Sequence, residues 1–459
     1  MATYHFDHLL TATRWLSPGY VSFGVDGRIS KISERAPAGD YVNVGGIAVP
    51  GVANLHSHAF QRGMAGLSEF RTAAAQDSFW TWRDLMYRFV DRLSPDDLEA
   101  IASQLYVEML KAGFTSVGEF QYLHHDRDGT PFGNPAEMSL RTLAAAEATG
   151  IGITMLPVLY QYAGFGEQPA RDEQRRFIND PDRFLDIYRV LDEATARHDN
   201  FRTGIAPHSL RAVGEDAIRD VVAEIAETTP IHMHIAEQEQ EVSDCVAFSG
   251  LRPVQYLLDR VEVDERWCLI HATHMTAEEA KAAAISGSIA GLCPTTEANL
   301  GDGLFDMPGW RASAGAIGIG SDSHISVSIV EELRWLEYGQ RLRDRRRNIA
   351  ADAAGSSGTN LLNATVSGGA RALGRARVSG ETGLVAGALA DIVVLDLDAP
   401  TFAGHKQETF IDAWLFSGNS PLVTDVFAGG VHVIRDGAHP DEEAIAIRYH
   451  ATLSKLLSE

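Results

Sequence analysis

Short apolar runs alternate with longer amphipathic stretches from about residue 49 to about residue 375. The short runs have the length of buried strands, whereas the longer stretches have the spacing of helices that bury one face. A repeated strand–helix order is typical of a parallel sheet that is covered by helices. Eight runs predict strands at residues 46–50 leading to His56, 115–120, 153–159, 203–208, 231–235, 267–271, 289–293 and 317–322. The pattern therefore predicts an α/β fold, a (β/α)8 barrel of the TIM type.

The two ends of the chain follow another pattern, with short alternating strands separated by glycines, as in residues 383–396 and 426–433. Such segments are typical of small antiparallel sheets. We therefore expect the N- and C-terminal segments to pair into one small β-sandwich domain. The expected division is residues 1–48 and 376–440 for this domain, 49–375 for the catalytic barrel and 441–459 for a C-terminal helix.

Polar residues with metal-binding or acid–base chemistry stand at the ends of the predicted strands. Five of the eight runs end in, or lead directly into, His56, His208, His234, His271 or Asp322. In a (β/α)8 barrel, the carboxyl ends of the strands share one face, and the catalytic groups cluster there. These side chains are therefore expected in one cavity.

The histidine pair His56-x-His58 has the two-residue period of a strand, so both imidazoles should project to the same side. An isolated pair of this kind is more often a polar loop. Here His234 and Asp322 are expected at the same rim, and together the four residues form a candidate metal set. His232 lies one layer deeper, where we expect a hydrogen-bonded core histidine.

Three imidazoles and one carboxylate suit a single divalent ion with a position left for water, as in catalytic zinc sites. Such an ion lowers the pKa of bound water from about 15.7 toward about 7. This chemistry favours hydrolysis. Zinc is the expected metal, although the same ligands suit iron or manganese. Glu237, three residues after His234, is placed to carry a proton, with a plain surface acid as the alternative.

Composition narrows the possible partners. The net charge of −23 argues against nucleic acid or an anionic membrane as partner, and an anionic substrate would need local arginines. The first residues lack a basic segment followed by an apolar one, and no apolar stretch is long enough to cross a bilayer, so a cytoplasmic location is expected. Cys245, Cys268 and Cys293 show no paired spacing and are expected to be reduced core residues.

Nearly the whole chain resembles the amidohydrolase superfamily, with His-x-His after strand one, His after strands five and six, and Asp after strand eight. Within it, the chain is similar to the N-formimino-L-glutamate deiminases of histidine degradation. The metal motif indicates only the superfamily. The narrower resemblance rests above all on Trp80-Thr81-Trp82-Arg83 and on Thr-Glu-Ala-Asn-Leu-Gly-Asp-Gly at 296–303, with further matches at 54–62, 77–83, 234–238, 293–303 and 320–324.

The resemblance implies hydrolytic deimination of N-formimino-L-glutamate to N-formyl-L-glutamate and ammonia. It implies one metal ion, because the second strand offers no lysine that could bridge two. Glu237, His271 and Asp322 would then move protons and orient the nucleophile. A homodimer is also implied by the family.

The implied substrate carries two carboxylates and a cationic amidine, so its site should offer bidentate cations at one end and an acid at the other. Arg83 and Arg211 are the candidates for the carboxylates, with surface arginines as the alternative. Gln61, Tyr122 and His208 follow strands one, two and four and are expected to meet polar groups of the substrate.

Two other interpretations stay open at this point. The first is a deaminase of the same superfamily that acts on an aromatic heterocycle such as guanine or an adenosine derivative. The second is an inactive barrel that serves as a scaffold, which the four retained candidate ligands disfavour.

Overall fold

The apolar runs meet in one parallel sheet that closes into a barrel, which confirms the predicted fold class. The computed structural model describes residues 2–71, 77–352, 355–376 and 382–458. Neighbouring strands pair in the order β11-β10-β9-β8-β16-β15-β14-β13, and β12 also pairs with β10. Parallel bridges from Ile205 to Ile231 and from Ser209 to His234 close the ring. The strands are β8 (Val52–Ser57), β9 (Phe114–Gln121), β10 (Gly152–Leu159), β11 (Phe201–Thr203), β12 (Ala206–Pro207), β13 (Ile231–Ile235), β14 (Trp267–His271), β15 (Ile289–Leu292) and β16 (Ala316–Ile319).

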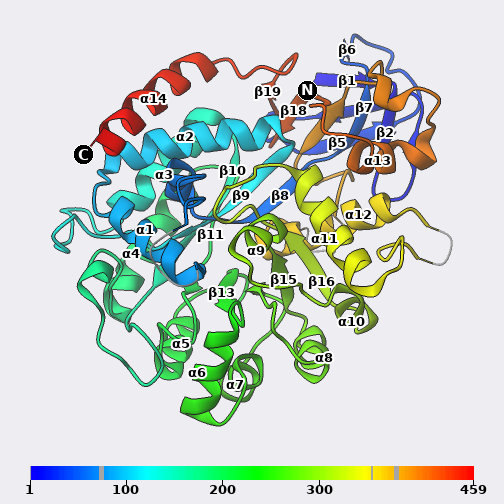
Figure 1. The fold of residues 1–459 in the computed structure, drawn as a ribbon. Coiled ribbons are helices and arrows are strands. Elements are labelled where there is room, and N and C mark those ends of the chain that lie inside the picture. Colours follow the sequence, from blue (N-terminus) through cyan, green and yellow to red (C-terminus); the bar gives the residue numbers. More distant parts are fainter. Residues whose placement is uncertain (1, 72–76, 353–354, 377–381, 459) are drawn as a thin grey trace.

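Helices surround this barrel on the outside (Figure 1). Several begin at an oxygen-bearing cap: Ser94 and Thr276, for example, each accept a hydrogen bond from the backbone N–H three residues on. The barrel helices are η1 (Ala59–Met64), α1 (Phe79–Val90), α2 (Pro95–Lys111), α3 (Glu137–Thr149), η2 (Asp172–Gln174), α4 (Pro181–Thr195), α5 (Glu215–Ala223), α6 (Glu239–Ser249), α7 (Pro253–Arg260), α8 (Ala277–Ser286), α9 (Pro294–Leu300), α10 (Met307–Ala312), α11 (Ile329–Asp344) and α12 (Ser357–Ala372).

The first predicted barrel strand is wrong in position. Residues 46–50 correspond to β7 (Ile47–Pro50), which pairs with β17 (Ile392–Leu395) in the small domain. The barrel strand is β8, which starts immediately after Gly51. The apolar pattern runs through both strands because both are buried, and it therefore does not mark the boundary between them. The expected boundary between residues 48 and 49 therefore falls in the middle of β7 and assigns Val49 and Pro50 to the barrel.

The fourth and eighth barrel positions are shorter than predicted. The fourth is split into β11 and β12, and the eighth ends at Ile319, three residues before Asp322. Asp322 itself still bridges to Ser57 in parallel register. Regular strand pairing therefore ends shortly before Asp322, the polar residue that was predicted to close this strand.

The small domain is a sandwich of two sheets, as predicted. In Figure 1 its N-terminal strands lie beside α13 (Gln407–Phe416), β18 and β19 from the other end of the chain. Phe427 joins the two layers, with its ring centroid 5.8 Å from that of Phe23. One sheet has the order β5-β4-β1-β6, and the other has the order β19-β18-β17-β7-β2-β3. Their further strands are β1 (Ala2–Phe6), β2 (His8–Leu10), β3 (Trp15–Leu16), β4 (Gly19–Phe23), β5 (Ile29–Ser33), β6 (Val42–Asn43), β18 (Val423–Ala428) and β19 (Val431–Ile434), and a short helix, η3 (Pro400–Phe402), precedes α13.

The last helix, α14 (Glu442–Ser458), returns to the barrel and lies along α2 (Figure 1). Arg448 and Lys455 pair with Glu99 and Asp97 of α2. Leu456 is its fully buried anchor. Within the described part of the chain, no helix is both long and apolar enough to cross a membrane.

Candidate metal and active site

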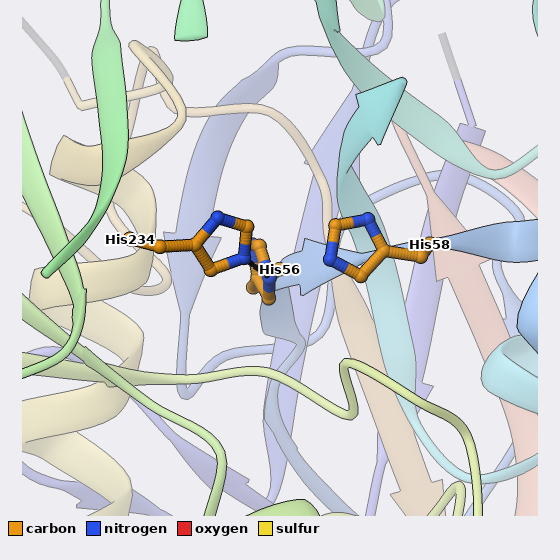
Figure 2. A group of neighbouring side chains, drawn as sticks. All are labelled: His56, His58 and His234. Carbon is orange, nitrogen blue, oxygen red and sulfur yellow. Dashed lines mark hydrogen bonds between the residues drawn. The ribbon is translucent and has the colours of Figure 1, made fainter. Parts of the chain in front are cut away.

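Three imidazoles meet inside the barrel at the carboxyl ends of its strands (Figure 2). His56 lies in β8, His58 follows the last residue of β8, and His234 lies in β13. All three are buried, and their ligand atoms lie within 4.8 Å of one another. The Nε2 atoms of His56 and His234 are 3.0 Å apart.

A bulge in β8 brings His56 into this cavity. The interval Asn54–Ser57 opposes Val117–Glu119, so β8 has one residue more than β9 here. Such an extra residue breaks the strict alternation of side chains. Leu55 can therefore pack in the apolar cluster at the base of the barrel, while the adjacent His56 faces His234.

Backbone hydrogen bonds set the tautomers of two of the imidazoles. His58 Nδ1 donates to the carbonyl oxygen of Phe120 at 3.0 Å, and His234 Nδ1 donates to that of His208 at 3.2 Å. A nitrogen that donates carries the proton, so the Nε2 lone pair of each ring is free. Both lone pairs point toward His56.

Asp322 adds a carboxylate to the three imidazoles. Its Oδ1 lies 3.4 Å from His56 Nε2 and 3.3 Å from His58 Nε2. Its backbone is left-handed, with φ 45°, and its N–H donates to the carbonyl oxygen of His56 at 3.0 Å. Left-handed non-glycine residues are strained and collect at functional sites. Ala236 and His271, at the ends of β13 and β14, share this conformation with φ 50° and 65°.

Burial and the neighbouring side chains together set the charge of these four groups. Burial lowers the pKa of His56 to about 3, and it also lowers the pKa of His58 and His234. Burial alone would raise the pKa of Asp322, but the hydrogen bond from His56 and the surrounding imidazoles lower it instead. The cluster thus offers three neutral imidazoles and one carboxylate anion.

This donor set fits one metal ion. Bonds of about 2.0–2.1 Å to one ion that also keeps a position for water place neighbouring ligand atoms about 3–3.5 Å apart. The separations of 3.0, 3.4 and 3.3 Å that join His56, His58, His234 and Asp322 lie in that range. The chain therefore carries a histidine-rich cluster able to hold a divalent metal.

His271, Glu237 and Glu297 form an acid–base group beside the cluster. His271 Nε2 lies 3.8 Å from Glu237 Oε1 and 3.9 Å from Asp322 Oδ2. Its Nδ1 lies 3.3 Å from Glu297 Oε1. Burial alone would lower the pKa of His271, but Glu237, Glu297 and Asp322 together raise it to about 10. Burial raises the pKa of Glu237 to about 7, although His271 and Arg211 oppose the shift.

The sequence did not reveal the roles of Glu297 and Glu119. Glu297 lies in the stretch 293–303 that carries the family resemblance, which is the signal that could have found it. Glu119 lies in β9, two residues before its end, and accepts hydrogen bonds from Ser57 Oγ, Ala59 N and Tyr106 OH. It thereby ties the chain on both sides of His58 to the neighbouring strand. A carboxylate within a predicted buried strand was its only sequence signal.

One cavity opens onto these groups and also brings together the predicted substrate contacts. It is lined by His58, His234, Glu237, His271 and Asp322, and also by Gln61, Arg83, Tyr122, His208 and Arg211. His56 lies beneath this lining and is fully buried. Every residue proposed from sequence for catalysis, metal binding or substrate binding is thus in or directly under one cavity.

Two cations without carboxylate partners face this cavity. Arg211 is buried, and Arg83 packs over the Trp80 ring at 4.5 Å from its centroid. The Nε atoms of both guanidinium groups are buried and have no hydrogen-bond partner. Within the described ranges, neither guanidinium lies in ion-pair distance of a carboxylate. Burial lowers the pKa of Arg83. Burial alone would also lower the pKa of Arg211, but nearby groups, Glu241 and Glu237 among them, outweigh it and raise that pKa. Two cations that line the cavity and are not engaged in ion pairs fit an anionic ligand.

The structure also confirms two predictions for residues outside the cavity. His232 Nε2 donates to the carbonyl oxygen of Ala372 at 2.8 Å, as expected for a core histidine. Cys245, Cys268 and Cys293 are free and buried. Cys293 also lies near His271 and Glu297, close enough for their ligand atoms to form a second potential grouping.

Comparison with known proteins agrees with this geometry. A family model described as "Amidohydrolase family" matches residues 47–433. The chain belongs to the amidohydrolase family. The match begins at β7 and ends in β19, so it covers the barrel together with part of the small domain.

Individual amidohydrolase relatives cover the full length. Formimidoylglutamate deiminase of Pseudomonas aeruginosa is 49% identical over 458 residues, with 100% of each chain covered. The crystal structure of an amidohydrolase from Brucella melitensis superposes with a TM-score of 0.94 at 46% identity, covering 100% of both chains. An adenosine deaminase from Xanthomonas campestris, solved with bound zinc, has a TM-score of 0.80 at 20% identity and covers 100% of this chain and 99% of its own. The last similarity concerns the fold alone.

Proposed function

We propose that this chain is a metal-dependent hydrolase that converts N-formimino-L-glutamate and water into N-formyl-L-glutamate and ammonia. The observation that carries this proposal is the combination, in one cavity, of the histidine–aspartate cluster with two guanidinium groups that form no ion pair with any described residue. A linear amidine that also carries two carboxylates matches both halves of such a cavity. The similarity to a formimidoylglutamate deiminase over the whole chain supports the same substrate.

In this proposal, His56, His58, His234 and Asp322 hold one divalent ion, for which zinc is expected. When bound, such an ion lowers the pKa of water to about 7 and so supplies a nucleophile at neutral pH. The Nδ1 bonds of His58 and His234 hold their rings in the orientation that this role needs.

Arg83 and Arg211 bind the carboxylates of the substrate. Each lines the cavity and carries a planar donor fork, and among the described residues neither forms an ion pair that would compete for the substrate. This fixes the substrate with its formimino group directed at the histidine cluster. Gln61, Tyr122 and His208 line the space between the two ends.

Glu237 carries the proton that the reaction must move. With a pKa of about 7, its buried carboxyl group can accept a proton from the attacking water and pass it to the terminal nitrogen of the substrate. The terminal nitrogen then leaves as ammonia, while the glutamate nitrogen stays bound to the formyl carbon. His271, held through Nδ1 by Glu297, keeps its cationic Nε2 beside Glu237 and Asp322 and orients the attacking water. Asp322 is a second acceptor for the proton of the attacking water.

The direct test is ammonia release by the zinc-loaded protein, with N-formimino-L-glutamate and a panel of purines as substrates. We expect turnover with the amidine and none with guanine or adenosine derivatives. Turnover of a purine and not of the amidine would instead identify a heterocycle deaminase.

Arg83→Ala and Arg211→Ala separate the same alternatives. Each should raise KM for the dicarboxylate far more than it lowers kcat, because each removes a contact that is made before and during the reaction. Arg189→Ala, at a largely exposed arginine of α4, is the matched control and should leave both constants unchanged. Unchanged KM in both cavity variants would contradict the assignment.

We further propose that the enzyme works in the cytoplasm as a homodimer. Its three cysteines are free and buried, in keeping with a reducing compartment. The homodimer is proposed from the family resemblance alone, and light scattering of the purified protein tests it.

A further inference from the structure

Gln174 holds two tyrosines at the end of the cavity opposite the histidine cluster. It is the last residue of η2 and is buried. Its Oε1 accepts a hydrogen bond from the backbone N–H of Arg171 at 2.8 Å. Because a backbone N–H can only donate, the amide oxygen must face Arg171, and the amide nitrogen must face the other way.

The amide nitrogen of Gln174 donates to two phenol oxygens. Nε2 lies 2.7 Å from the Tyr160 oxygen and 3.4 Å from the Tyr87 oxygen. Each phenol therefore accepts at its oxygen and has its own proton left to donate. In the described part of the chain, no acceptor lies within hydrogen-bond distance of either proton. A buried hydroxyl without an acceptor is costly, so both protons indicate an acceptor that comes from outside.

The surroundings of these hydroxyls indicate the charge of that acceptor. Tyr87 and Tyr160 line the cavity together with Arg83 and Arg211. The Arg83 guanidinium carbon lies 5.6 Å from the Tyr87 ring centroid. Burial raises the pKa of Tyr160, which keeps its hydroxyl protonated at neutral pH. This end of the cavity therefore offers two hydroxyl donors and two cations, a set that matches an anion.

Ring contacts place this group on the far side of His208. The His208 ring lies 4.9 Å from that of His234 and 4.6 Å from that of Tyr160. His208 thus separates Tyr160 from the histidine cluster by one ring. A ligand whose formimino group is at the cluster reaches Tyr160 with its opposite end.

We propose that the Tyr87 and Tyr160 hydroxyls, directed by Gln174, donate to the substrate carboxylate that lies farther from the histidine cluster. They make this subsite selective for a carboxylate over the corresponding amide. A carboxylate accepts only, whereas the NH2 group of an amide would meet donors and leave them unsatisfied. This inference rests on the proposed function, and it assigns roles to three residues that the reaction scheme above does not use.

Tyr87→Phe and Tyr160→Phe test the subsite, since each removes one donor and keeps the ring. We expect each to raise KM for N-formimino-L-glutamate about tenfold with little change in kcat, as for loss of a hydrogen bond to a charged group. The binding preference for N-formyl-L-glutamate over N-formyl-L-glutamine, measured by calorimetry, should fall by a similar factor. Tyr188→Phe is the control, because this largely buried phenol bonds to Thr229 outside the cavity.

Gln174→Glu tests the positioning role of the amide. A carboxylate at this place would accept the phenol protons and turn them away from the cavity. We expect a rise in KM at least as large as in either phenylalanine variant, with kcat retained. A fall in kcat with an unchanged KM would overturn the positioning role.

Two outcomes separate this inference from the proposed function. In the first, the wild-type protein releases ammonia, but both phenylalanine variants have the KM and the binding preference of the wild type. This outcome overturns the subsite alone. Wild-type protein that releases no ammonia overturns the proposed function, and the binding preference for N-formyl-L-glutamate in the variants then decides the subsite by itself.

Discussion

At the scale of single residues, the partner of each imidazole decides its role. His58 and His234 donate through Nδ1 and leave Nε2 free inside the barrel, whereas His232 uses Nε2 on a backbone carbonyl. His124 is likewise bound to the carbonyl oxygen of Val158. Residue type alone does not distinguish these uses, because all four rings are buried.

Replacing Glu237 with glutamine should remove the proton carrier and keep the shape of the site. We expect kcat to fall at least a hundredfold, in line with loss of general acid–base catalysis, while zinc content stays the same. Steady-state kinetics together with elemental analysis measures both. Glu239→Gln, at an exposed acid two residues on, is the control. Near-normal turnover of the zinc-loaded Glu237→Gln protein would contradict the role given to Glu237.

His124 should make the fold sensitive to acid. Burial lowers its pKa to about 3, against about 6.5 in the unfolded chain. As pH falls below 6.5, the unfolded chain takes up a proton that the folded chain does not, so stability decreases. This histidine should cost about 2 kcal/mol between pH 7 and pH 5.

His124→Gln keeps the donor to Val158 and does not titrate, so its loss of stability between pH 7 and pH 5 should be smaller by that amount. Urea unfolding at the two pH values measures the difference. The exposed His450, replaced by Gln, is the control and should behave as the wild type. An equal loss in both variants would show that His124 is not responsible.

At the scale of elements, the site depends on the close approach of β8 and the segment after β16. Gly320 lies where this segment passes His56, and a Cβ atom there would lie 2.7–2.8 Å from the Cβ, N and O atoms of His56. The same approach carries the hydrogen bond from Asp322 N to His56 O. His56 and Asp322, two candidate ligands from distant parts of the chain, are thereby joined by a backbone hydrogen bond.

Gly320→Ala should push these segments apart, because backbone atoms cannot yield as a flexible side chain can. We expect a loss of about 1–3 kcal/mol in stability and weaker zinc binding. Thermal unfolding and zinc titration of the purified variant measure the two effects. Gly39→Ala, where an added Cβ would meet nothing within 4 Å, should change neither. Zinc affinity equal to that of the wild type would show that the approach can relax.

At the scale of the whole molecule, the candidate ligands connect β8, β13 and the segment after β16. His56 in the first of these elements and Asp322 in the last are more than 260 residues apart in the chain. An ion held by all three would bind the folded barrel and not the unfolded chain. Metal binding should therefore stabilise the complete barrel.

Removal of the metal should lower the thermal midpoint, and zinc should restore it. At free zinc of one hundred times its dissociation constant, the gain in stability is about 2.7 kcal/mol. Scanning calorimetry with a chelator and then with added zinc measures this gain. His234→Ala should abolish the gain, and His450→Ala should retain it. A midpoint independent of zinc in the wild type would argue against the proposed ligand set.

Local spacing was sufficient to predict most of the architecture. Apolar residues that recur every two residues predict strands, and those that recur about every four residues predict helices. These local periods predicted the barrel, the sandwich and the polar residues at the strand ends. The same spacing could not separate β7 from β8, because two buried strands in succession give one apolar run.

By itself, the sequence determined which residues stand at the rim of the barrel. A residue is placed there by its position at the end of its own strand, which the local pattern predicts. The tertiary structure alone decided the bulge that turns His56 inward, the contact of Glu297 with His271, and the pairing of Gln174 with Tyr87 and Tyr160. These depend on side-chain and strand contacts between elements far apart in the chain, for which no local pattern exists. The physical reason is that a strand's period is a property of its own residues, whereas a hydrogen-bond partner is a property of the packed fold.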